Sequence, residues 1–405
     1  MDAAMDIAAN AAHQKSWQRN LVLLNSIAFT RMFMLVLPIF VPLMAHYGLN
    51  MHQTMLLQSV FAGTVLLCEL PSGYLSDIWG RRQVLIIANL FGGLGFSVLL
   101  FADSFASVAL FEVLIGVAFS LSSGTDTSMV YESEQALKRP DSGKAIAHQL
   151  SWMGFGEAVA AGLTTLLMLK GYRWVLLVQM VVGWLPLLLS LALREPPRTR
   201  SSLSHRENGK AIWKAFTAQR SIPILAALFL LVMSFIWLVA WLNQPLWLGV
   251  NLDPFWFGLL WGGECLVVGL VARYAQGTHR YLLASRRWWL LAIAVLASWA
   301  FIAHSATLAG LLVGAYLAAT LHGAAIPWIR EGINRLVDST YRATINSVLS
   351  TLFRGFNLLL GPWLGSLVDT HGASGAGAWL LLIAAPLAVL LCWWGWQQRE
   401  SSRDL

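Results

Sequence analysis

Charged residues are scarce in this sequence. Only 12% of the 405 residues are Asp, Glu, Lys or Arg, whereas 57% are hydrophobic. A soluble domain carries about 25% charged residues, so a chain of this composition cannot cover its surface with polar groups in water. The shortage of charge excludes a soluble globular protein and indicates a membrane protein that crosses the bilayer several times.

Cysteines and catalytic motifs are also scarce. The three cysteines, Cys68, Cys265 and Cys392, all lie within apolar runs, where they provide no disulfide framework. The chain contains no Walker A, His-Glu-x-x-His or Gly-x-Ser-x-Gly pattern, and its isolated histidines lack metal-ligand spacing. We therefore expect no metal, no cofactor and no enzymatic activity.

The net charge of +7 does not indicate nucleic-acid binding. Such binding needs a basic face on a water-exposed domain, whereas the basic residues of this chain fall in short segments between apolar runs. Basic residues in such loops fix the orientation of a membrane protein. We therefore expect membrane lipid as a partner and no nucleic acid.

Long apolar runs are the main feature that is present. A spanning helix needs about 20 mostly apolar residues. We predict an all-helical membrane protein with twelve spans, at residues 20–46, 52–73, 82–102, 104–130, 145–168, 172–194, 221–247, 254–275, 287–304, 306–329, 343–368 and 376–396.

Basic residues predict the orientation of these spans. An even number of spans places both termini on one side. Lys170 and Arg173 are the basic residues in the predicted external loops, Arg31 and Arg354 fall within spans, and the remainder of the 27 lie on the other face. Because basic loops stay inside, both termini are predicted to be cytoplasmic.

A basic stretch that contains prolines, residues 195–220, divides the predicted spans into two sets of six. It is either a helix lying on the inner leaflet or a solvated linker. The predicted segments are a cytoplasmic tail (1–19), a first six-helix bundle (20–194), a cytoplasmic central loop (195–220), a second six-helix bundle (221–396) and a cytoplasmic tail (397–405).

One polar stretch, Gly73-Tyr-Leu-Ser-Asp77-Ile-Trp-Gly80-Arg81-Arg82, separates the second and third predicted spans. Glycine permits a close helix approach and a tight reversal, and the charged residues can pair in one conformation and separate in another. The stretch resembles the cytoplasmic signature loop of the major facilitator superfamily, and the span count and six-plus-six division resemble that family across the whole chain.

This resemblance implies two pseudo-repeats that rock around a central cavity, with the loop acting as a gate. Asp126, near the inner end of the fourth span, is expected to pair with Arg81 or Arg82 of that gate. Shorter stretches, such as Glu69-Leu-Pro-Ser-Gly73, resemble a bacterial subgroup of drug and small-solute transporters. They imply a multi-pass protein of the bacterial cytoplasmic membrane.

Charged residues within spans are candidate functional residues, because a charge at mid-membrane costs a few kcal/mol. They are Arg31, Glu112, Glu157, Glu264 and Arg354. The family fold would bring Glu157 and Glu264 face to face from the fifth and eighth helices. The three glutamates are candidate proton carriers, and the arginines are candidate substrate ligands; the alternative is that all five form static buried ion pairs.

The seventh span carries a possible substrate surface. Trp237, Trp241 and Gln244 follow an i, i+4, i+7 spacing, so they share one helix face. Aromatic rings with an amide suit a flat or amphipathic ligand. Other tryptophans near span ends, including Trp247 and Trp256, are expected to be interfacial anchors.

These features predict a monomeric secondary transporter that moves a small organic solute, with proton-coupled export as the preferred direction and mechanism. The first alternative is proton-linked uptake of an organic anion at Arg31 and Arg354. The second is a membrane sensor that transports nothing, although the tails are too short for an appended sensory domain.

Overall fold

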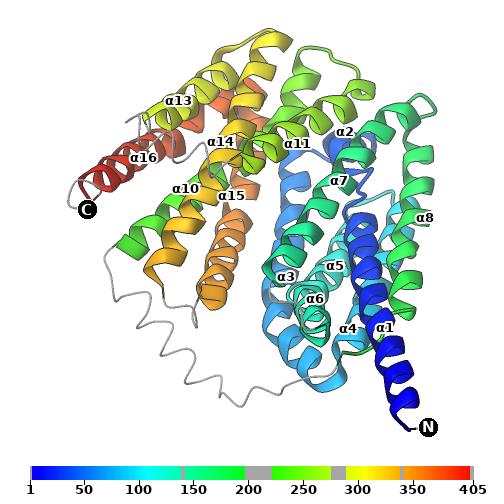
Figure 1. The fold of residues 1–405 in the computed structure, drawn as a ribbon. Coiled ribbons are helices and arrows are strands. Elements are labelled where there is room, and N and C mark those ends of the chain that lie inside the picture. The colour runs from blue at the N-terminus through cyan, green and yellow to red at the C-terminus, as the bar shows by residue number, and fades with distance from the viewer. Residues whose placement is uncertain (1, 138–141, 197–220, 275–288, 338–341, 402–405) are drawn as a thin grey trace.

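The structure is a computed structural model that describes residues 2–137, 142–196, 221–274, 289–337 and 342–401. The secondary structure of these ranges is helical. The first group of elements is α1 (Asp2–Arg31), η1 (Leu37–Ile39), α2 (Phe40–His46), α3 (Met51–Trp79), α4 (Arg81–Leu100), α5 (Phe105–Ser122), α6 (Thr125–Ala136), α7 (Ser142–Met168) and α8 (Tyr172–Leu191). Figure 1 shows this group in blue to green.

The second group follows the central segment of the chain. It consists of α10 (Ser221–Gly249), η2 (Pro254–Trp256), α11 (Phe257–Arg273), α13 (Trp289–His304), α14 (Leu308–Leu336), α15 (Arg342–Trp379) and α16 (Leu381–Ser401). Figure 1 shows the second group in green to red beside the first.

Membrane-crossing helices are abundant. Within the described residues, nine helical segments are long and apolar enough to cross a membrane, and Leu37–His46 and Trp289–His304 are shorter apolar helices. Each of the twelve predicted ranges is occupied by at least one helix. One predicted boundary differs from the structure, because α1 begins at Asp2, inside the predicted tail. Residues 197–220 of the predicted central loop lie outside the described residues.

The first predicted span, 20–46, is not one continuous helix. α1 ends at Arg31, and the chain becomes helical again only at Leu37. Pro38 sits in the first turn of η1, and a proline disfavours helical geometry in the residue before it and lacks a backbone donor. The span is therefore broken within the bundle.

Side chains from three other helices satisfy the backbone at this break. The Leu35 N–H donates to Gln179 of α8, and Thr164 of α7 donates to the Leu35 carbonyl at 2.8 Å. Gln244 of α10 accepts from the Val41 N–H at 2.9 Å and donates to the Leu37 carbonyl at 3.0 Å. Irregular backbone at membrane depth requires such partners, so these hydrogen bonds stabilise the break within the bundle.

The seam between α7 and α11 is tight at one end and wide at the other. A Cβ on Gly258 would lie 2.2 Å from the Ala161 carbonyl oxygen, so the helices touch there. A Cβ on Gly269, further along α11, or on Gly154 of α7 would meet no atom within 4 Å. The helices therefore separate from Gly258 toward Gly269.

The seam between α3 and α15 is closed over a longer distance. A Cβ on Gly365 would lie 2.6 Å from the His52 Cα, and the Ser59 hydroxyl donates to the Leu358 carbonyl at 2.8 Å. We call the end with α2 and the start of α3 the closed end, and the opposite end, where α3 meets α4, the open end (Figure 1).

Candidate substrate cavity and gate

A cavity of about 1090 Å³ lies between the two groups of helices. Its walls come from α7, α10, α11 and α14, with Phe353 of α15, and Leu37 of the broken first span also lines it. A drug-sized ligand occupies a pocket of roughly 300–1,000 Å³. The cavity is therefore large enough for a small organic molecule.

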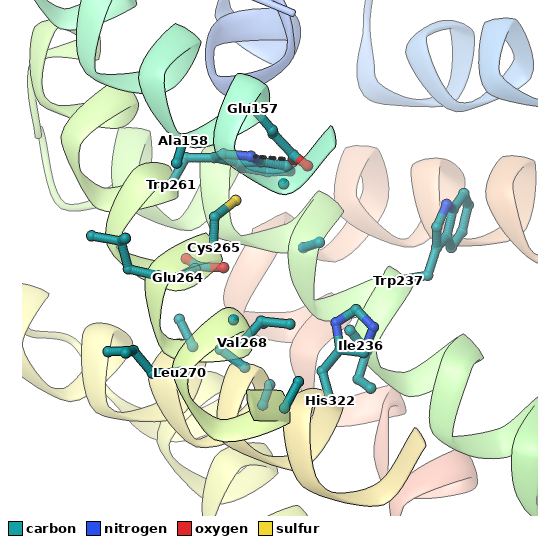
Figure 2. Close-up of a pocket in the computed structure, with 18 of the residues that line it drawn as sticks. Glu157, Ala158, Ile236, Trp237, Trp261, Glu264, Cys265, Val268, Leu270 and His322 are labelled. Carbon is teal, nitrogen blue, oxygen red and sulfur yellow. Dashed lines mark hydrogen bonds between the residues drawn. The ribbon is translucent and has the colours of Figure 1, made fainter. Parts of the chain in front are cut away.

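Two glutamates line this cavity. Glu157 of α7 accepts a hydrogen bond from the Trp261 indole N–H at 3.1 Å, and Glu264 of α11 accepts one from the Asn243 amide at 2.9 Å. Figure 2 shows the Cys265 side chain between the two carboxylates. The α7–α11 seam therefore brings together two acids that lie 107 positions apart in the sequence, counting from 157 to 264.

Aromatic side chains form part of the remaining wall. Trp237 and Trp241 of α10 both line the cavity, with ring centroids 6.2 Å apart, and Trp261 of α11 joins them. Phe40 of α2 packs edge-on against Trp241 at 5.7 Å. Figure 2 shows the Trp237 ring across the cavity from the two glutamates, with His322 beneath it. The cavity thus joins carboxylates to flat apolar surfaces.

The cavity opens where α7 and α11 separate. Leu150 and Phe155 of α7 are 59% and 56% exposed, and Leu270 of α11 is 58% exposed, although all three line the cavity. Arg273 lies at the exposed end of α11. Access therefore comes from the open end, whereas the contact at Gly258 blocks the seam toward the closed end.

Both arginine candidates lie in ion pairs outside the cavity. Arg31 of α1 pairs with Asp126 of α6, so the observed partner of Asp126 is Arg31 and not the expected Arg81 or Arg82. The reason is that α1 packs against α6. Arg354 of α15 pairs with Glu69 of α3 at 3.2 Å and stacks on the Phe119 ring at 5.1 Å.

Two further candidates lie away from the cavity wall. Glu112 of α5 is 4% exposed and accepts a hydrogen bond from the Gln58 amide of α3 at 2.9 Å. Gln244 shares a helix with Trp237 and Trp241, but its amide is bonded to the broken first span. The structure thus places Glu112 within the first group of helices, and Gln244 against the end of the cavity.

The predicted gate loop is a tight helix-to-helix turn. Gly80 joins α3 to α4 with φ of 111°, a conformation that favours glycine. The Glu195 carboxylate accepts the Arg81 and Arg82 N–H groups at 2.9 and 2.8 Å, which caps α4. The Arg81 side chain contacts Glu132 of α6 at 3.3 Å.

Three residues of that stretch, Gly73, Tyr74 and Asp77, are described only by their helical backbone. The pairing expected for Asp77 therefore lies outside the described residues.

Several residues of the site have no local sequence signal. Asn243 and Trp261 hold the cavity glutamates, Glu195 caps α4, and Asp369 of α15 bonds the start of α3. Asn243 was visible as a polar residue within an apolar span. The other three depend on contacts between distant segments, which spacing along one helix cannot reveal.

The fold and the sequence together define a class of transport protein. The sequence pattern of the Major Facilitator Superfamily matches residues 21–362. The chain belongs to this superfamily and is a multi-pass membrane transporter, not an enzyme. No curated protein matches the chain.

Solved structures with the same fold are transporters of different solutes. The nucleoside transporter NupG is similar with a TM-score of 0.73 at 15% identity, over 93% of this chain and 98% of that chain. A bacterial homologue of the human lysosomal transporter Spinster gives 0.70 at 17% identity, over 96% and 97%. A D-xylose-proton symporter gives 0.69 at 14% identity, over 92% and 96%. These likenesses show the fold alone.

Proposed function

We propose that this transporter exports a small organic solute from the bacterial cytoplasm in exchange for protons. It acts as a monomer in the cytoplasmic membrane, with twelve spans and both termini inside. The observation that carries the proposal is the cavity of about 1090 Å³, which holds two glutamates and an aromatic wall between the two groups of helices.

Alternating access follows from the two seams. The α7–α11 seam is closed at Gly258 and parted at Gly269, which is what a rocking motion of one six-helix half against the other produces. With the termini inside, the open end faces the cytoplasm. The Gly73–Arg82 loop, including Asp77, lies at that end and acts as its gate when the halves close there.

Proton coupling is assigned to Glu157 and Glu264. Both carboxylates line the cavity, and among the residues that the structure describes neither has an ion-pair partner. A buried charge without a counter-charge is costly, so each acid takes up a proton or a cationic partner as the cavity changes sides. Proton coupling is known on this fold in the D-xylose-proton symporter.

Organic-anion uptake is disfavoured by the position of its two arginines. Arg354 is paired with Glu69, outside the cavity. Arg31 is paired with Asp126 and borders a void of only about 40 Å³, which is room for a few water molecules at about 10–15 Å³ each. Neither guanidinium can receive an organic anion in this conformation.

Reconstitution into proteoliposomes tests the function. A library of lipophilic compounds is screened for counterflow and for accumulation driven by a proton gradient. Glu157→Gln and Glu264→Gln should abolish gradient-driven accumulation and retain counterflow, whereas Glu112→Gln, a matched change outside the cavity, should retain both. Normal accumulation in both cavity variants would show that the proton assignment is wrong, and a protein without counterflow of any compound would not be a transporter of this class.

A further inference from the structure

The charge balance of the cavity points to the kind of solute it holds. Among the described residues that line it, the ionisable side chains are Glu157, Glu264, Cys265, His322 and Arg273. Arg273 is exposed at the open end of the cavity, so the interior contains two acids and no arginine or lysine.

The two glutamates have neutral partners. Neither cavity acid belongs to the ion pairs seen among the described residues, such as Arg31–Asp126, Arg81–Glu132 and Arg354–Glu69. An indole N–H and a side-chain amide orient the two carboxylates, but neutral donors do not cancel a negative charge. A positively charged ligand would supply the counter-charge that these two carboxylates lack.

The opposite wall suits the same ligand. Trp237 and Trp241 of α10 line the cavity, and the indole ring is the best aromatic partner for a cation held within about 6 Å of its centroid. Figure 2 shows Trp237 on the opposite side of the view from Glu264 and Glu157. An organic cation between these walls would meet carboxylates on one side and indole faces on the other.

We propose that the solute is an amphipathic organic cation, bound between the Glu157–Glu264 pair and the indoles of Trp237 and Trp241. This inference rests on the proposed transport function and adds the charge class of the substrate. It also explains the coupling, because a proton and the organic cation compete for the same carboxylates, and one leaves when the other arrives.

The test compares two probes of the same size and shape with opposite charge. Tetraphenylphosphonium and tetraphenylborate are titrated into the full-length protein in lipid nanodiscs, and binding is followed by tryptophan fluorescence and calorimetry. Tetraphenylphosphonium should bind, and tetraphenylborate should bind at least tenfold more weakly. Glu157→Gln and Glu264→Gln should each weaken tetraphenylphosphonium binding at least tenfold, whereas Glu112→Gln should leave it unchanged.

The outcomes separate the inference from the function. The cation assignment is wrong if tetraphenylborate binds equally or more tightly, or if both cavity variants bind tetraphenylphosphonium as the unaltered protein does. Counterflow of another solute would then still support the transport function. If tetraphenylphosphonium binds with the expected pattern but the protein shows no counterflow of any solute, the cation site is supported and the transport function is wrong. If a glutamine variant fails to fold, the comparison of the two probes on the unaltered protein still decides the preferred charge.

Discussion

One contact at the closed end is a helix cap supplied across the two groups of helices. The Asp369 carboxylate of α15 accepts the Met51 N–H at 2.9 Å and the His52 N–H at 2.8 Å, the first two N–H groups of α3. Asn50 and Gln53 form a capping box that satisfies the third position. The start of α3 therefore depends on a residue from the other half of the molecule.

Removing this carboxylate should favour opening of the closed end. Asp369 is exposed, so we take about 0.75 kcal/mol for each of the two hydrogen bonds and about 0.5 kcal/mol for the charge at the helix N-terminus. The sum is about 2 kcal/mol, which corresponds to a change of about thirtyfold in the ratio of closed to open molecules. Asp369→Ala should shift the equilibrium by that factor.

Pulsed electron paramagnetic resonance can measure this shift. Spin labels at Asp103→Cys and Ala306→Cys, with the native cysteines replaced, report the distance between two exposed loops of opposite groups. The Asp369→Ala variant should show an added population at longer distance. Asp253→Ala is the matched control, because Asp253 caps η2 within its own half by accepting the Phe255 N–H. An unchanged distance distribution in Asp369→Ala, or an equal shift in the control, would refute the reasoning.

Two further changes test the packing. Gly258→Val should lower the unfolding temperature and force the α7–α11 seam apart, because its Cβ would lie 2.2 Å from a backbone oxygen of α7; Gly269→Val, with no atom within 4 Å, is the control for thermal unfolding. Gln244→Leu should cost about 1–3 kcal/mol, because it leaves the buried Val41 N–H without a partner, whereas the Leu37 carbonyl keeps the Phe40 N–H; unchanged thermal stability would contradict this role.

Much of the helical architecture is predictable from the sequence. Apolar runs locate the helices, because a spanning segment needs about 20 mostly apolar residues and must satisfy its own backbone hydrogen bonds. The break after Arg31 was missed although Pro38 is visible in the sequence, because the run of apolar residues continues through it. Trp247, predicted to be an interfacial anchor, is fully buried and packs on Phe257 at 5.0 Å, since it lies on the face of α10 that packs against the start of α11.

The candidate site is predictable only in part. Buried acids in apolar spans stand out, and Glu157 and Glu264 both line the cavity. Glu112 has the same local signature but faces Gln58 within the first group of helices. The difference depends on the rotation of each helix about its axis and on which helix lies beside it. Those quantities arise from packing between distant segments and leave no pattern in a single sequence.

The broken first span has a consequence for related sequences. Its backbone is held by Thr164, Gln179 and Gln244, which come from three helices and from both halves of the molecule. A change at one of these positions removes a partner that the other two cannot replace. In an alignment of close relatives, positions 164, 179 and 244 should therefore vary together with the residues around Pro38, and a relative with an unbroken first helix should lack all three polar side chains.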